Sequence, residues 1–224
     1  MSRNTVVYTL VALLVLSVST SLQSAEGWIT DYEAAKKQAA KEGKDILMDF
    51  TGSDWCGWCI RLKKEVFSQE AFKKEAPKHF VLLELDYPRS KQLAPALKAQ
   101  NEKLKNEFAI QGYPTIMLTD ATGKAYAKTG YQPGGPESYI KHLAEKAGVK
   151  KERDKNFAAA AKATDNAEKA KLLDLALSKI EETGGIPVLA NYGDVVAQII
   201  KLDGDNKAGL KSKYEARFAL QKLD

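Results

Sequence analysis

The segment "DFTGSDWCGWCIRLKKEV", residues 49–66, holds the only two cysteines of the 224-residue chain. Cys56 and Cys59 follow a nearly continuous apolar run at residues 45–50, which is typical of a strand buried on both faces of a sheet. The residues after the second cysteine favour a helix, whose apolar face we expect to contain Ile60, Leu62, Val66 and Phe67. A C-x-x-C pair between a strand and a helix leaves three interpretations open: disulfide exchange, metal binding or a structural loop.

The apolar patterns on either side of this segment predict a mixed α/β domain. A second buried strand is expected at residues 80–87, and a hairpin at residues 113–131. Strand, crossover helix and strand imply a parallel pair, to which the hairpin adds antiparallel strands. We therefore expect a mixed central sheet flanked by helices. These helices are expected from Asp31 to Glu42 with Gly43 as the stop, within residues 88–108, and from Pro136 to Gly148.

The composition changes at about residue 150, where the chain becomes rich in Ala, Lys and Leu and loses its strand signals. We expect a small all-α C-terminal domain, residues 150–224, after an α/β domain at residues 26–149. "DNAEKAK" and "DNKAGLK" recur 40 positions apart and suggest helix-pair repeats resembling the tetratricopeptide type, whose usual period is about 34. A plain helical appendage has equal weight. Its helices are expected to break at residues 164–166, 184–187 and 203–206.

The N-terminal residues resemble a secretory signal peptide. Arg3 precedes a charge-free apolar run from Val6 to Val18, which is shorter than the roughly 20 residues of a membrane span. We expect cleavage near Ala25, so that residues 1–25 are a signal peptide and the mature chain is exported, either periplasmic or secreted. Membrane association is expected only if this segment stays uncleaved.

The charge pattern argues against a nucleic-acid partner. The net charge is only +5, and lysines and acidic residues are interspersed along the chain. No basic stripe with interleaved aromatic residues is present, and such a stripe is the usual mark of nucleic-acid binding.

Disulfide exchange is favoured over the other two interpretations of the cysteine pair. A structural zinc site needs four ligands, and beyond the cysteines the chain offers only His79 and His142, so no metal is expected. A passive staple across so short a loop would add little stability. At a helix N-terminus the Cys56 thiolate would be favoured by the unpaired N–H groups, and Cys59 would lie one turn later to resolve a mixed disulfide.

"DILMDF", "DWCGWC" and the distant "GYPT" together resemble the thioredoxin superfamily over residues 28–148, about half of the chain. The resemblance implies the thioredoxin fold, in which the tryptophan before the first cysteine is a hallmark. It also implies that Pro114 is cis and that Tyr113 offers its backbone to an extended substrate strand. The substrate-binding residues implied in this way are Trp55, Gly57, Trp58, Tyr113 and Pro114.

The resemblance also gives Asp49 the role of a buried acid that moves a proton to or from the resolving thiol. A carboxyl group in an apolar strand should have a raised pKa. Two features depart from the family pattern at this point: Cys56 is seven positions after Asp49, one more than usual, and the strand "FVLLELD" lacks the lysine that often accompanies the acid. Trp58 is a third departure, since it replaces the proline of the thioredoxin motif.

The sequence therefore predicts an exported thiol–disulfide oxidoreductase with Cys56, Cys59 and Asp49 as its catalytic residues. Protein thiols and disulfides and an upstream redox partner are the expected partners, and no organic cofactor is expected. The direction, whether protein-disulfide reductase, oxidase or isomerase, stays open. The alternative is a non-catalytic, chaperone-like binding module whose helical tail recognises a partner and whose cysteines form a passive disulfide.

Overall fold

The computed structural model of the protein describes residues 27–221. The predicted signal peptide, residues 1–25, lies outside the described residues. Within the described part of the chain, no helix combines the length and the apolar character needed to cross a membrane.

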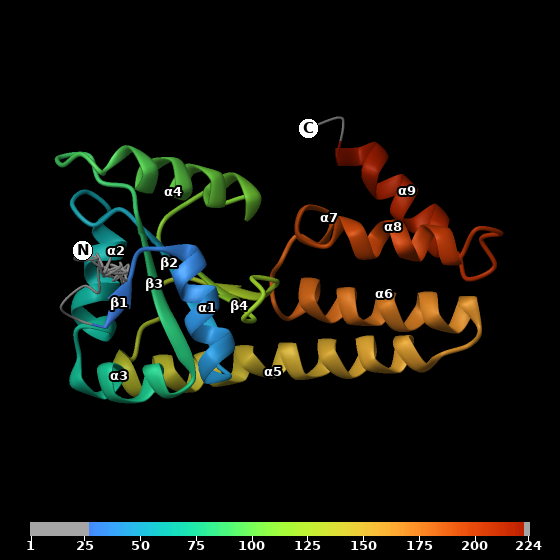
Figure 1. Ribbon diagram of the computed structural model, residues 1–224, viewed down its shortest axis with the longest axis horizontal. Coiled ribbons are helices and arrows are strands. Elements are labelled where there is room, and N and C mark those ends of the chain that lie inside the picture. Colours follow the sequence, from blue (N-terminus) through green and yellow to red (C-terminus); the bar gives the residue numbers. More distant parts are fainter. Residues whose placement is uncertain (1–26, 222–224) are drawn as a thin grey trace, which may run out of the picture.

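The N-terminal half forms one five-stranded mixed sheet with the strand order β1-β3-β2-β4-β5 (Figure 1). The first three strands in this order are parallel to one another, whereas β4 and β5 are antiparallel to their neighbours. The predicted mixed sheet is confirmed. The sequence missed β1, because two residues are too short to carry a pattern. The strands are β1 Trp28–Ile29, β2 Asp45–Thr51, β3 Phe80–Asp86, β4 Thr115–Thr119 and β5 Ala125–Thr129.

Helices cover both faces of the sheet, as predicted. One face packs against α1 (Tyr32–Glu42) and α4 (Pro95–Glu107). The other packs against α2 (Gly57–Leu62), α3 (Glu70–Glu75) and the first part of α5 (Gly135–Lys162). A π-helix, η1 (Lys63–Phe67), continues α2 directly, and a 3-10 turn, η2 (Ala76–Lys78), follows α3. The helix α1 has the predicted ends, with Asp31 as N-cap and Gly43 in the left-handed conformation as C-cap.

The helix α5 runs from Gly135 to Lys162, so the prediction that it ends at Gly148 was wrong. Nothing lies within 4 Å of a Cβ atom built at Gly148, and this glycine does not break the helix. Buried side chains continue beyond it at helical spacing, including Val149, Arg153 and Ala160. The predicted domain boundary at residue 150 therefore falls inside α5, which runs beneath both the sheet and the C-terminal helices (Figure 1).

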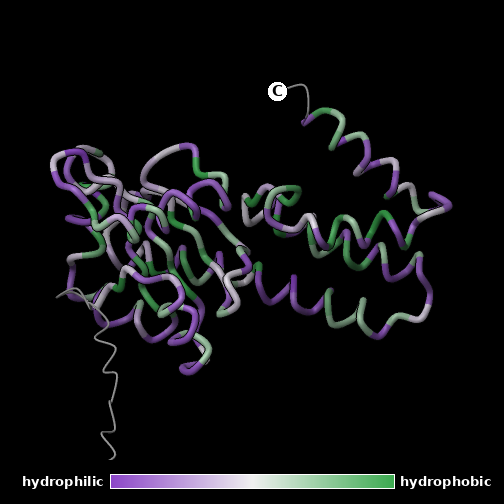
Figure 2. The backbone as a smooth tube through the Cα atoms, turned by 45° about the horizontal axis from the view of Figure 1, so that its top comes forward, coloured by the Kyte–Doolittle hydropathy of each residue, from purple (hydrophilic) through white to green (hydrophobic). Residues whose placement is uncertain are grey.

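The C-terminal residues are helical, with breaks close to the predicted positions. They form α6 (Asn166–Glu182), α7 (Val188–Asn191), α8 (Gly193–Leu202) and α9 (Leu210–Gln221). The helix α6 returns along α5, and α8 packs on α6 (Figure 1). Figure 2 shows hydrophobic residues concentrated in the strands and along α6 and α8. These helices share one hydrophobic cluster with the α1 face of the sheet.

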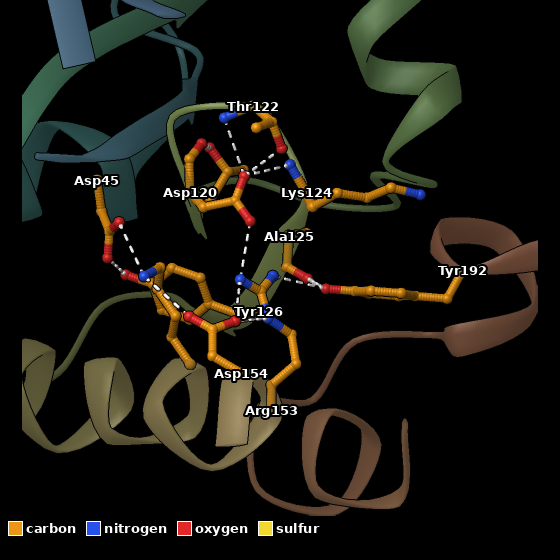
Figure 3. Close-up of polar contacts among 11 residues, drawn as sticks. Asp45, Asp120, Thr122, Lys124, Ala125, Tyr126, Arg153, Asp154 and Tyr192 are labelled. Atoms are coloured by element: carbon orange, nitrogen blue, oxygen red, sulfur yellow. Dashed lines mark hydrogen bonds and ion pairs between the residues drawn. The ribbon is translucent and has the colours of Figure 1, made fainter. Parts of the chain in front are cut away.

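Buried polar contacts join the C-terminal helices to the sheet (Figure 3). Arg153 of α5 donates from Nη2 to Oδ2 of Asp120, 2.8 Å away in the β4–β5 turn. It also donates from Nη1 to the hydroxyl of Tyr192 at 3.1 Å. That hydroxyl in turn donates to the backbone carbonyl of Ala125 at the start of β5. The contacts tie α5, the hairpin and the start of α8 into one unit.

The connection after α6 covers the edge of the sheet at β5. The backbone N–H of Lys128 donates to the carbonyl of Gly184 at 2.7 Å. A Cβ atom at Gly184 would lie 2.3 Å from the carbonyl oxygen of Tyr126 and 2.4 Å from that of Ile180. Only glycine allows this close approach of two backbones.

Candidate functional site

The two cysteines lie at the start of α2, after the loop that follows β2. Cys56 is the N-cap of the helix, and it forms a disulfide with Cys59, with 5.2 Å between the two Cα atoms. The backbone N–H of Cys59 points to Sγ of Cys56 at 3.2 Å. Both residues are buried, Cys56 with 6% of its surface exposed and Cys59 with 3%. An N–H group directed at Sγ can stabilise negative charge on that sulfur once the disulfide is opened.

Asp49 of β2 lies on the same face of the sheet as α2. Neighbouring residues alternate between faces: Leu47 belongs to the cluster under α2 and α3, whereas Met48 belongs to the opposite one. Asp49 is buried, and its Oδ1 atom has no hydrogen-bond partner among the described residues. Burial, and next the negative charge of Glu84, raise the pKa of its carboxyl group well above the usual range, in the predicted direction.

A cavity of about 450 Å³ connects this acid with Cys59. Asp49, Cys59, Lys63 and Glu84 are among the residues that line it. The side chains of Cys59 and Asp49 therefore face one shared cavity.

Lys63 lines this cavity and comes from the helix η1. The resemblance to the thioredoxin superfamily instead leads us to expect a lysine on the strand next to Asp49. Glu84 of β3 is the register partner of Asp49 in the parallel pair, so both side chains point to the same face. Nζ of Lys63, in η1, lies 3.8 Å from Oε2 of Glu84. The positive charge of Lys63 lowers the pKa of Asp49, against the larger effects of burial and Glu84. Lys63 of η1 thus supplies the positive charge that β3 lacks.

Trp55 is packed on several sides next to the cysteines. Its indole N–H donates to the carbonyl of Tyr87 at 2.8 Å, and the guanidinium of Arg89 lies 3.8 Å from its ring centroid. The ring meets Tyr113 edge to face, with 5.7 Å between centroids. A Cβ atom at Gly52 would lie 2.5 Å from the indole, so glycine at this position makes room for the ring.

The peptide bond between Tyr113 and Pro114 is cis, which confirms the expectation from the sequence. The strand β4 begins at the next residue, Thr115, which pairs with Phe50 near the end of β2. The predicted "WCGWC" and "YPT" segments therefore meet at the same end of the sheet. Tyr113 is half-buried between Trp55 and Tyr87.

The two residues between the cysteines are both exposed. A side chain at Gly57 would meet nothing within 4 Å. Trp58 is 56% exposed and lies against Tyr131, with 5.1 Å between ring centroids. The expected position of Ile60 on the apolar face was wrong, since it is 47% exposed. The buried residues are Cys59, Leu62 and Val66, which follow one another at intervals of three and four positions, as on one face of a helix.

Two acidic residues that the sequence reasoning missed hold the motif loop in place. The carboxylate of Asp54 accepts from the backbone N–H groups of Arg89 at 3.0 Å and Ser90 at 2.7 Å. Hydrogen bonds from the Ser90 side chain and from these N–H groups lower the pKa of Asp54 to about 2. Asp86 accepts from the backbone and the hydroxyl of Ser53. The partners lie more than 30 positions apart, so no local pattern could reveal them.

The two histidines make their contacts outside the cysteine motif. Nε2 of His142, on α5, lies 2.8 Å from the hydroxyl of Thr129, and His79 follows η2 at the opposite end of β3 from the motif. In residues 27–221, no group of three or more His, Cys, Asp or Glu side chains converges. The expectation of a metal-free site stays a prediction.

Comparison with known proteins places the site in a family. Residues 32–147 match the family model of the thioredoxin-like domain. The chain is 33% identical over 109 residues to the disulfide bond reductase DsbH of Chlamydia pneumoniae, covering 49% of this chain and 66% of that protein. It is 32% identical over 115 residues to the thioredoxin-related protein DsbJ of the same organism, covering 48% of this chain and 33% of DsbJ.

A solved structure agrees with these matches. The structure of a DsbH oxidoreductase superposes with a TM-score of 0.51 at 31% identity, covering 53% of this chain and 82% of the other. The chain spans just under two thirds of the first curated relative and one third of the second. The matched residues hold the cysteine pair, the buried acid and the cis-proline segment. The chain belongs to the thioredoxin-like family.

Proposed function

We propose that this protein is an exported thiol–disulfide oxidoreductase that reduces disulfides of protein substrates through Cys56 and Cys59. One observation carries the proposal: the Cys56–Cys59 disulfide lies at the start of α2, and Cys59 lines the same cavity as the buried Asp49 carboxyl group. A passive staple needs neither the helix N-terminus nor an acid with a raised pKa beneath it.

In the first step the Cys56 thiolate of the reduced protein attacks one sulfur of a substrate disulfide. A mixed disulfide with Cys56 forms, and the other substrate sulfur leaves as a thiol after taking up a proton. The N–H group of Cys59, 3.2 Å from Sγ of Cys56, is placed to stabilise the attacking thiolate.

In the second step the thiolate of Cys59 attacks Sγ of Cys56 and releases the second substrate thiol. Two electrons have then passed to the substrate, and the protein is left with the disulfide seen here. Asp49 accepts the proton that Cys59 loses. A carboxyl group with a raised pKa is suited to this exchange near neutral pH.

The direction, partners and location are part of the proposal. The name of the first relative, a disulfide bond reductase, favours the reducing direction. An upstream thiol donor must then return the Cys56–Cys59 pair to its reduced form. The matches to Dsb-type proteins and the apolar N-terminal run of the sequence support export.

The proposal is tested with the reduced protein and a peptide disulfide. Cys56→Ser should abolish thiol release, whereas Cys59→Ser should release one thiol and trap a mixed disulfide visible by mass spectrometry. If Cys56→Ser reduces the peptide at the wild-type rate, the mechanism is wrong.

A redox titration separates the proposal from the binding-module alternative. A Cys56–Cys59 couple that equilibrates with glutathione or thioredoxin-like donors, above about −300 mV, supports exchange, whereas one that stays oxidised well below this value indicates a structural bridge.

A further inference from the structure

Exposed aromatic surface lies directly beside the cysteine pair. Within residues 27–221, four large apolar side chains stand out as exposed, and two of them, Trp58 and Ile60, flank Cys59. An exposed tryptophan on a protein surface is a feature that interaction sites share.

Trp58 is held in place by its neighbours although it is exposed. Its ring lies 5.1 Å from that of Tyr131, and the guanidinium of Arg61 lies 5.4 Å from the Trp58 ring and 5.1 Å from the Tyr131 ring. The hydroxyl of Tyr131 donates to Oε2 of Glu65 at 2.6 Å, and Nε of Arg61 donates to Oε1 at 2.7 Å. These four residues, Trp58, Arg61, Glu65 and Tyr131, form a closed ring that we call the aromatic platform.

The platform carries no net charge. The carboxylate of Glu65 is bound by both Tyr131 and Arg61, and these hydrogen bonds lower its pKa, so it stays ionised beside the guanidinium. A ligand that approaches the two rings therefore meets an apolar surface rather than a free cation.

The platform is continuous with the site of exchange. Trp58 lies between the two cysteines in the chain. The platform also adjoins the cis-proline segment. A Cβ atom at Gly130, the residue before Tyr131, would lie only 3.2 Å from the carbonyl oxygen of Pro114. A substrate strand that pairs with the backbone at Tyr113 and Pro114 would thus run next to the platform as its sulfur reaches Cys56.

We propose that the aromatic platform is a substrate subsite that selects extended polypeptide segments with an apolar, above all aromatic, side chain beside the cysteine that is attacked. The inference rests on the proposed function and deepens it. Tyr131 is its specificity residue, since it lies outside the cysteine motif and contacts Trp58 directly. The apolar side chain of the substrate stacks on the Trp58 and Tyr131 rings while the exchange proceeds at Cys56.

Three short peptides test the proposal. Each has a single cysteine that carries thionitrobenzoate and is flanked on both sides by phenylalanine, by serine or by aspartate. The reduced protein attacks the peptide sulfur and releases coloured thionitrobenzoate, and Cys59 then frees the peptide thiol. The full chain should react about tenfold faster with the phenylalanine peptide than with the serine peptide, as one aromatic contact allows. The aspartate peptide should be no faster than the serine peptide.

The variants separate the platform from the general reactivity of the thiols. Tyr131→Ala should lower the phenylalanine-to-serine rate ratio to about two or less, whereas Tyr131→Phe, which keeps the ring, should retain it. Leu175→Ala, an exposed apolar residue of α6, is the control and should leave both rates unchanged.

Each outcome decides one question. Equal rates for the phenylalanine and serine peptides, a fastest rate for the aspartate peptide, or an unchanged ratio in Tyr131→Ala would overturn the subsite. A wild-type rate no higher than that of Cys56→Ser with every peptide would instead overturn the proposed function itself.

Discussion

Arg153 and Asp120 form a buried ion pair, 2.8 Å from Nη2 to Oδ2, between the long helix α5 and the hairpin of the sheet. Only 4% of Arg153 is exposed. Its remaining donors reach Tyr192 and Asp154, so the guanidinium is well satisfied (Figure 3). The pair joins the helical region to the same sheet that carries the cysteines.

Breaking this pair from one side should be costly. Arg153→Ala leaves the Asp120 carboxylate half-buried without its cation, and we expect a loss of about 3–5 kcal/mol in the free energy of unfolding. Arg217→Ala removes an arginine that pairs with Glu181 nearer the surface and should cost no more than about 1 kcal/mol. Urea unfolding of the two variants makes the comparison, and equal losses would contradict it.

The same pair should give the protein a specific sensitivity to acid. Burial alone would raise the pKa of Asp120, but hydrogen bonding from Thr122 and the charge of Arg153 outweigh it, and the net pKa is lowered. A lowered folded-state pKa stabilises the protein above the unfolded pKa of about 4, and this stability is lost as the pH falls through the folded value. Urea unfolding between pH 2 and 5 should therefore show a shallower decline for Arg153→Ala than for the wild type.

Asp49→Asn should slow the reaction and stabilise the protein. If Asp49 accepts the proton of Cys59 as proposed, its removal should slow resolution of the mixed disulfide by about tenfold to a hundredfold. Because the folded-state pKa of Asp49 is raised, folding stability falls as the pH rises from the unfolded pKa of about 4 towards the folded value. The variant should thus unfold less readily than the wild type at pH 8 and similarly at pH 3. Stopped-flow tryptophan fluorescence gives the concentration-independent resolution step, and an unchanged rate would count against the role of Asp49.

Lys63 and Glu84 should tune the pH dependence of that step in opposite directions. Glu84 raises the pKa of Asp49, and Lys63 lowers it. The midpoint of the pH profile for resolution should therefore move down in Glu84→Gln and up in Lys63→Met, each by up to about one unit. The rate is measured from pH 5 to 9, and shifts of the same sign in both variants would refute the assignment.

The two glycines of the motif region should respond differently to alanine. A Cβ atom at Gly52 would collide with the Trp55 indole at 2.5 Å, and we expect Gly52→Ala to cost about 1–3 kcal/mol of stability. Gly57, at the start of α2, has open space around it, so Gly57→Ala should be neutral or stabilising by up to about 1 kcal/mol. Denaturant unfolding of the oxidised variants tests this, and a larger loss at Gly57 than at Gly52 would reverse the interpretation.

The sequence predicted those parts of the fold and site that depend on local patterns. Continuous apolar runs marked β2 and β3, and the caps at Asp31 and Gly43 marked α1. The cysteine pair was found because its residues stand together in the chain, whereas the cis bond at Pro114 was expected from the resemblance to the thioredoxin superfamily.

Features that depend on contacts between distant residues were missed. Glu84 faces Asp49 only through the register of two strands, and Tyr131 reaches Trp58 only after the chain returns through β5. Gly148 gave a false helix end, because this glycine keeps the helical conformation inside α5. In α5 the buried face continues to Ala160.

The hydrogen bond from Lys128 to Gly184 has a consequence for solubility. The strand β5 lies at the edge of the sheet, and an open edge strand can recruit a strand from another molecule and start aggregation. The segment after α6 occupies the N–H group of Lys128 in the middle of that edge, with a backbone approach that only glycine permits. The helical region thus covers this edge of the sheet against strand pairing with a second molecule.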